Sequence, residues 1–163
     1  MREAASKIVS RAMLKSAFAE HKGRGKTIVF ANGCFDVLHV GHTRYLEGAA
    51  REGDILAVGV NADASVASLK GAGRPILDEN ARALLVAALR CVDYVVIFPE
   101  ATVEALLEEL RPDVHAKGTD YTEDTVPERA TATRLGIRVA IVGDSKDHST
   151  RTLFDSIGKA PHA

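Results

Sequence analysis

The chain has 163 residues, of which 46% are hydrophobic and 26% charged, and its formal net charge at pH 7 is −1. This size and composition predict one folded soluble domain over residues 1–163 and exclude a disordered chain. The charge balance argues against a general nucleic-acid-binding protein, and no apolar run approaches the roughly 18 residues that cross a membrane. Two distant cysteines and no apolar leader predict a reduced, cytoplasmic protein.

Residues 1–26 differ in charge from the remainder, with seven basic residues against two acidic ones. Small and apolar residues recur in this segment at helical spacing, at Ala5, Ile8, Val9, Ala12 and Met13. We therefore expect an amphipathic helix packed on the domain, with a solvated basic face, that ends at a glycine-rich linker over residues 23–26.

Residues 27–163 alternate between short β-branched runs and segments long enough for a helix. The clearest of these helices is expected after Leu77, with Asp78 as its N-cap. Its expected apolar stripe is Ala81, Leu84, Leu85, Ala88 and Leu89. The strand-like runs cover residues 27–31, 55–60, 92–98, 114–116 and 137–142. This order predicts a three-layer α/β fold, a Rossmann-like, doubly wound five-stranded parallel sheet with an added N-terminal helix.

Ligands of such sheets bind beyond the carboxyl ends of the strands, and the segment after the first strand carries an unusual histidine pair. His39 and His42 flank Gly41, a pattern that composition alone would produce roughly 0.02 times in a chain of this length. The spacing places both imidazoles on one face of a first helical turn, where unpaired N–H groups attract anions. The absence of a side chain at Gly41 would let a phosphate approach the backbone.

Three other interpretations of this segment stay open. Asp36, His39 and His42 could together hold a transition metal, although Asp36 would precede the helix and Gly41 would have no purpose in that site. The two histidines could instead satisfy buried polar groups only. Cys34 could act as a nucleophile, but this would need a base and a pKa-lowering environment that the sequence does not show, so we expect a small buried thiol near the end of the strand.

The segment from residue 32 to residue 42 resembles the opening motif of the His-x-Gly-His nucleotidyltransferases, also described as cytidylyltransferase-like. That family includes glycerol-phosphate cytidylyltransferases and heptose 1-phosphate adenylyltransferases. Lys117-Gly118-Thr119-Asp120-Tyr121 and the basic N-terminal segment are most similar to the heptose 1-phosphate adenylyltransferases. The remaining matching positions are Val60-Asn61-Ala62-Asp63-Ala64-Ser65, Lys70-Gly71, Arg74-Pro75, Arg82, Val92-Asp93-Tyr94-Val95-Val96, Pro112-Asp113 and Ser149-Thr150.

The resemblance implies transfer of AMP from ATP to a heptose 1-phosphate, with release of pyrophosphate. It implies Mg²⁺ bound with ATP rather than in a protein metal site, and a homodimer. The implied catalytic residues are His39, His42 and Lys70. The implied residues for the nucleotide are Gly33, Cys34, Phe35, Gly41, Arg82, Lys117, Gly118, Asp120, Ser149 and Thr150. The implied residues for the sugar phosphate are Asp36, Lys70 and Arg74.

Several alternatives remain at this level. Cytidylyl transfer to glycerol 3-phosphate or another small alcohol phosphate would use the same motif, and the chain departs from the family at Arg151, where a further hydroxyl residue is common. A catalytically silent nucleotide-binding module would share the fold. A dehydrogenase would need Gly-x-Gly-x-x-Gly, which the segment Gly71-Ala72-Gly73-Arg74-Pro75 lacks. A tRNA synthetase fragment shares the histidines but would need a longer chain with a second, lysine-rich signature.

Overall fold

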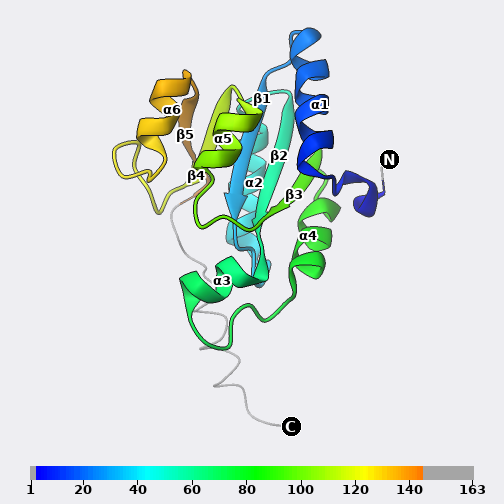
Figure 1. The fold of residues 1–163 in the computed structure, drawn as a ribbon, viewed down its shortest axis with the longest axis vertical. Helices are drawn as coiled ribbons and strands as arrows, with labels where there is room; N and C mark the ends of the chain where they lie inside the picture. Colours follow the sequence, from blue (N-terminus) through cyan, green and yellow to red (C-terminus); the bar gives the residue numbers. More distant parts are fainter. Residues whose placement is uncertain (1–2, 145–163) are drawn as a thin grey trace.

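The computed structural model describes residues 3–144, so the predicted contacts of Ser149 and Thr150 lie outside the described residues. Five parallel strands form one sheet in the order β3-β2-β1-β4-β5, which confirms the predicted architecture (Figure 1). The strands are β1 (Ile28–Gly33), β2 (Ile55–Asn61), β3 (Tyr94–Phe98), β4 (Val114–Gly118) and β5 (Arg138–Val142). The helices are α1 (Arg11–Gly23), α2 (Val40–Ala50), α3 (Asp63–Lys70), α4 (Glu79–Ala88), α5 (Glu104–Leu110) and α6 (Arg129–Leu135), with a short 3₁₀ helix at Ala4–Lys7.

β1 occupies the centre of the sheet because its residues are apolar on both sides. Its first four residues are buried, as expected for a strand covered by helices on both faces. β1 pairs with β2 from Ile28 opposite Ile55, and with β4 from Val29 opposite Val114. The chain therefore leaves β1 toward β2 on one side and returns to β4 on the other. This reversal opens a crevice at the carboxyl end of β1.

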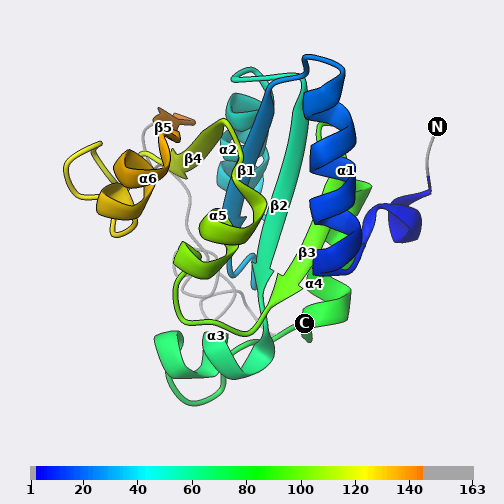
Figure 2. The same ribbon diagram turned by 45° about the horizontal axis from the view of Figure 1, so that its top comes forward.

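Two apolar clusters separate the sheet from the helices on its two faces. One cluster includes Leu46 of α2 and Val86 of α4. The other includes Phe18 of α1 and Leu106 of α5, with α6 beside them. Figure 2 shows α1, α5 and α6 on one face and α2 on the other, which gives the predicted three layers. No helix within residues 3–144 is long and apolar enough to cross a membrane.

The N-terminal segment differs from its prediction. The helix begins only at Arg11, after Ser10, whose hydroxyl caps it by accepting a hydrogen bond from the Met13 N–H at 3.2 Å. Ile8 instead forms a parallel bridge with Val95, and the Val9 N–H donates to the Val95 carbonyl at 2.9 Å. The open edge of β3 provides hydrogen-bond partners that helical periodicity cannot reveal. Met13, expected in the apolar stripe, is 61% exposed.

Helix α4 has the predicted N-cap but a different buried face. The Asp78 side chain accepts hydrogen bonds from the N–H groups of Asn80 and Ala81, as expected. The buried residues are Arg82, Ala83, Val86 and Ala87, whereas Leu84 and Leu85 are exposed. Both residue sets recur at helical spacing, so periodicity alone could not select between them. Small residues at 83 and 87 allow α4 to lie close to the sheet.

Candidate functional site

An open cavity of about 1090 Å³ lies at the carboxyl edge of the sheet, where the crevice was predicted. We call the part lined by Asp36, Lys70 and Arg74 the α3 side, and the part lined by Lys117, Tyr121 and Glu128 the β4 side. The histidines follow β1 and lie between these two sides. Of the predicted site residues, the cavity is lined by Gly33, Cys34, Phe35, Asp36, His39, Gly41, His42, Lys70, Arg74, Lys117, Gly118 and Asp120.

The two histidines stack at the start of α2. His39 is the N-cap residue of this helix, and its backbone N–H donates to Nδ1 of His42 at 3.4 Å. The ring centroids are 3.8 Å apart with an interplanar angle of 27°. Because Nδ1 of His42 accepts this hydrogen bond, the proton of its neutral ring resides on Nε2. The pair thus lies where helix N–H groups already favour an anion, as the spacing predicted.

The turn between β1 and the histidines is closely packed. Phe35 is buried, has a φ of +49°, and its ring meets His42 edge to face at 5.2 Å between centroids. A Cβ at Gly33 would lie 3.1 Å from the Phe35 ring, so glycine keeps room for this side chain. Phe35 therefore supports His42 from within the turn.

Cys34 is a thiol next to the end of β1, as expected, but it is partly rather than fully buried. Burial raises its pKa, although the charges of Lys70 and Arg82 oppose that shift. Its Sγ lies 3.9 Å from Oδ1 of Asn61. A thiol with a raised pKa is protonated at neutral pH, so the environment does not favour a nucleophilic thiolate.

Asp36 organises the loop that connects α3 to α4. Its carboxylate accepts hydrogen bonds from Nη1 of Arg74 and the N–H of Ile76, both at 2.6 Å, and from the N–H of Leu77 at 3.3 Å. These bonds join the histidine segment to the loop after Lys70. They also argue against the alternative of a metal held by Asp36 and both histidines, and no group of three such ligands occurs within residues 3–144.

Lys70 ends α3 and lines the cavity with an exposed side chain. Arg74 lines the same side while its guanidinium pairs with Asp36. Both cations therefore remain close to the water-accessible space of the α3 side. A phosphate group entering there would meet positive charge from each of them.

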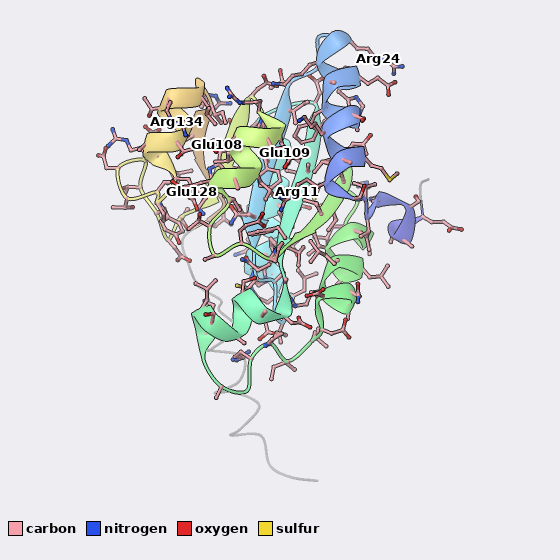
Figure 3. All side chains as sticks on the ribbon, viewed as in Figure 1. Arg11, Arg24, Glu108, Glu109, Glu128 and Arg134 are labelled. Carbon is pink, nitrogen blue, oxygen red and sulfur yellow. The ribbon has the colours of Figure 1, made fainter. Side chains whose placement is uncertain are left out.

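Lys117 is situated differently, although it was also predicted to bind a substrate, the nucleotide. Its side chain is 8% exposed, and its Nζ lies 3.4 Å from Oε2 of Glu128, whose side chain is 6% exposed. The ammonium also lies 4.8 Å from the centroid of the Tyr121 ring. Glu128, labelled in Figure 3, is the N-cap residue of α6 and lies eleven positions after Lys117 in the sequence. The charge of Lys117 is therefore balanced inside the protein.

On this side of the cavity, the structure places three residues that were not predicted as site residues. Asn32 and Tyr45 line the cavity, and His115 is buried beside Asn32. His115 is fully buried, and its Nε2 lies 3.1 Å from Oδ1 of Asn32. Burial lowers the pKa of His115 to about 3, so its ring is neutral at physiological pH. Tyr45 donates to the carbonyl of Ala116 at 2.9 Å, and burial raises its pKa. Asn32 belongs to the opening motif, but nothing in the sequence indicated the other two.

Arg82 does not occupy the predicted position. It was expected to contact the nucleotide, yet it is 0% exposed and does not line the cavity. Its guanidinium donates to the carbonyl of Cys34 and to the carboxylate of Asp63, while Nε donates to the carbonyl of Leu77. Arg82 points inward because α4 buries a different face from the predicted one. Its guanidinium therefore connects protein segments and does not face the cavity.

A parallel sheet with a histidine pair at a helix N-terminus and cations around one crevice is the arrangement typical of α/β domains that bind phosphate groups. A family model described as cytidylyltransferase-like matches residues 30–156, which confirms the resemblance drawn from the motifs. The chain belongs to the cytidylyltransferase-like family.

Two proteins with a shared name are similar to this chain over most of its length. The chain is 46% identical over 152 residues to the bifunctional protein HldE of Syntrophotalea carbinolica, covering 93% of this chain and 31% of that protein. It is 45% identical to the bifunctional protein HldE of Geobacter sulfurreducens, covering 97% and 32% respectively. The chain thus spans about a third of the length of these relatives.

A crystal structure of the lipopolysaccharide core biosynthesis protein from Thermoplasma volcanium is also similar to this chain. It is 36% identical and superposes with a TM-score of 0.61, over 72% of this chain and 94% of that one. The alignment therefore covers nearly all of that crystallised chain.

Proposed function

We propose that this domain transfers AMP from ATP to a heptose 1-phosphate, forming an ADP-heptose and pyrophosphate. The observation that carries the proposal is the stacked pair of His39 and His42 at the N-terminus of α2, inside the cavity. The relatives named above support a sugar phosphate as the acceptor, because one is a lipopolysaccharide core biosynthesis protein. The motifs that resemble heptose 1-phosphate adenylyltransferases point the same way.

In this reaction, a phosphate oxygen of the sugar phosphate attacks the α-phosphorus of ATP. The bond from that phosphorus to the bridging oxygen breaks, and its electrons leave with pyrophosphate. No proton must be removed from the attacking phosphate oxygen, so the protein needs to align two polyanions and stabilise the charge that develops. In our proposal, Nε2 of His42 donates to an oxygen near the breaking bond, and His39 stacks beside it and adds a second contact.

The unequal charge of the two sides of the cavity suggests where each substrate binds. We assign the attacking phosphate to the α3 side, where Lys70 and Arg74 provide positive charge. We assign the base and ribose to the β4 side, where Lys117 is paired with Glu128 and Asp120 adds a carboxylate. Gly33, Gly41 and Gly118 line the cavity between these groups and would permit close contact with the triphosphate.

Mg²⁺ fits this proposal as an ion bound mainly by substrate. Within residues 3–144 no cluster of three histidine, cysteine or carboxylate ligands is available, so the triphosphate oxygens would supply most of its coordination. When bound, the ion would neutralise charge on the departing pyrophosphate. The homodimer remains a prediction, which sedimentation of the purified protein will test.

The experiment is a matrix of ATP, CTP and GTP against heptose 1-phosphate, glycerol 3-phosphate and related acceptors, scored by pyrophosphate release. We expect the fastest release with ATP and heptose 1-phosphate. A preference for CTP with an alcohol phosphate would overturn the proposed substrates but retain nucleotidyl transfer. Nucleotide binding without pyrophosphate release for any acceptor would replace the enzyme with a silent binding module.

A further inference from the structure

Arg82 is the largest fully buried side chain in the described part of the molecule. Burial of a guanidinium is unfavourable unless its N–H groups find acceptors. Here Nη1 donates to the Cys34 carbonyl at 2.6 Å, Nη2 to Oδ1 of Asp63 at 2.7 Å, and Nε to the Leu77 carbonyl at 2.9 Å. A planar guanidinium fixes the directions of these three bonds together, which a lysine ammonium cannot do.

The three acceptors belong to three separate segments of the α3 side. Cys34 lies in the turn between β1 and the histidines, Asp63 is the first residue of α3, and Leu77 precedes the cap of α4. The Asp63 N–H also donates to the Glu79 carboxylate at 2.8 Å. Asp63, at the start of α3, is thus bound to α4 both through its carboxylate and through its backbone N–H. Lys70 is the last residue of this eight-residue helix. The bonds that hold the start of α3 therefore also set the direction of the helix and the place of Lys70.

The hydrogen bond from Arg82 to the Cys34 carbonyl controls the turn before the histidines. The Cys34 carbonyl belongs to the same peptide plane as the Phe35 N–H, so holding the oxygen orients that peptide. Phe35 has a φ of +49°, a conformation that surrounding structure must maintain in a non-glycine residue. Its ring contacts His42. A continuous path of contacts therefore connects Arg82 with His42.

We propose that Arg82 is a positioning residue that fixes Lys70 and His42 relative to each other, and that it does not bind the nucleotide. The inference rests on the proposed transferase function, in which Lys70 holds the attacking phosphate and His42 contacts the departing one. Loss of the three-way bond would leave each group in place locally but would weaken their alignment across the α-phosphorus.

The test compares Arg82→Lys with Arg138→Lys, an exposed arginine at the start of β5 whose ion partner is Glu52. The structure also supplies a readout that needs no activity. Cys34 and Cys91 are both partly buried thiols with pKa values raised by burial. Their alkylation rates by iodoacetamide, resolved by mass spectrometry, report on the turn beside Arg82 and on a distant site in the same molecule.

For Arg82→Lys we expect Cys34 alkylation to rise at least fivefold with Cys91 unchanged, kcat to fall at least tenfold, and the ATP dissociation constant to change less than twofold. Asp63→Asn should give the same pattern with a smaller amplitude, and Arg138→Lys should match the wild type. An ATP dissociation constant that rises tenfold with Cys34 unaffected would instead identify a direct nucleotide contact and overturn the proposal.

Equal acceleration at both cysteines would indicate general destabilisation and would also overturn the positioning role, as would unchanged kinetics and alkylation. If the wild-type protein releases no pyrophosphate with any acceptor, the proposed function fails first. The ratio of the two alkylation rates would then still decide whether Arg82 holds the Cys34 turn, and an unchanged ratio would reject even that part.

Discussion

Each side of the cavity carries a lysine, but the two lysines differ in burial and in whether a counter-ion neutralises their charge. On the α3 side, Lys70 is exposed at a helix end. On the β4 side, Lys117 is buried on a strand, beside Glu128 and over Tyr121. The two lysines are equivalent in a sequence pattern because each follows an apolar segment and precedes a glycine. Only the first has its charge directed at solvent-filled space.

This difference shows that a cation at the edge of a sheet is not automatically available to a ligand. A buried lysine needs its counter-ion, since an uncompensated charge in a poorly hydrated site is costly. The folded state therefore needs Glu128 beside Lys117, whether or not Lys117 also contacts a ligand. Lys70 has no comparable burial, so its substitution should affect binding more than folding.

Substitution of His42 should have the largest effect, because His42 lies between the two sides in the proposed reaction. We expect His42→Ala to lower kcat by about 10³-fold, by removing a donor to charge that develops in the transition state. Steady-state pyrophosphate release and thermal unfolding measure this. The matched variant Thr43→Ala, next on the same helix, should retain wild-type kcat; a similar loss there would assign the effect to helix α2 as a whole.

Lys117→Met should lower the free energy of unfolding by about 3 kcal/mol, since it leaves the Glu128 carboxylate buried without its counter-ion. Urea denaturation measures the change. The double variant Lys117→Met with Glu128→Gln should recover part of the loss, because the remaining group is neutral. If the single variant is as stable as the wild type, the contrast between the two sides of the cavity is wrong.

Lys70→Met should show the opposite pattern. We expect stability within about 0.5 kcal/mol of the wild type, as for most surface substitutions, and a roughly thirtyfold rise in KM for the sugar phosphate after loss of one charge-assisted contact. The KM for ATP should change much less. Lys15→Met, on the exposed surface of α1, is the control. A rise confined to the ATP KM would place the nucleotide on the α3 side instead.

His115 should produce a smaller, pH-dependent effect under the β4 side. Its folded-state pKa is about 3 against an ordinary value of 6.5, so the unfolded chain binds the additional proton first as the pH falls. Stability is therefore lost progressively between pH 6.5 and about 3, by about 2 kcal/mol at pH 5 relative to pH 8. Denaturation of the wild type and His115→Gln at both pH values measures this; equal slopes would contradict a buried neutral ring.

Much of the architecture could be predicted because it depends on patterns local to the chain. Apolar β-branched runs separated by helix-length segments specify parallel strands, and the Asp78 cap was visible as an acceptor before a helical run. The buried face of α4 could not be predicted, since two residue sets share the helical period. The N-terminal helix was predicted too long because Ile8 and Val9 bind the distant edge of β3.

The sequence by itself determined the parallel fold, the position of the cavity and the histidine pair. These features depend on the succession of strand-like and helix-length segments along the chain and on the spacing of neighbouring residues. Only the tertiary structure decided how each cation is used. Arg82 became a buried connection between three segments, Asp36 a partner of Arg74, and Lys117 a partner of Glu128. Burial and ion pairing depend on which residues of different segments meet in space, and that information is absent from local spacing.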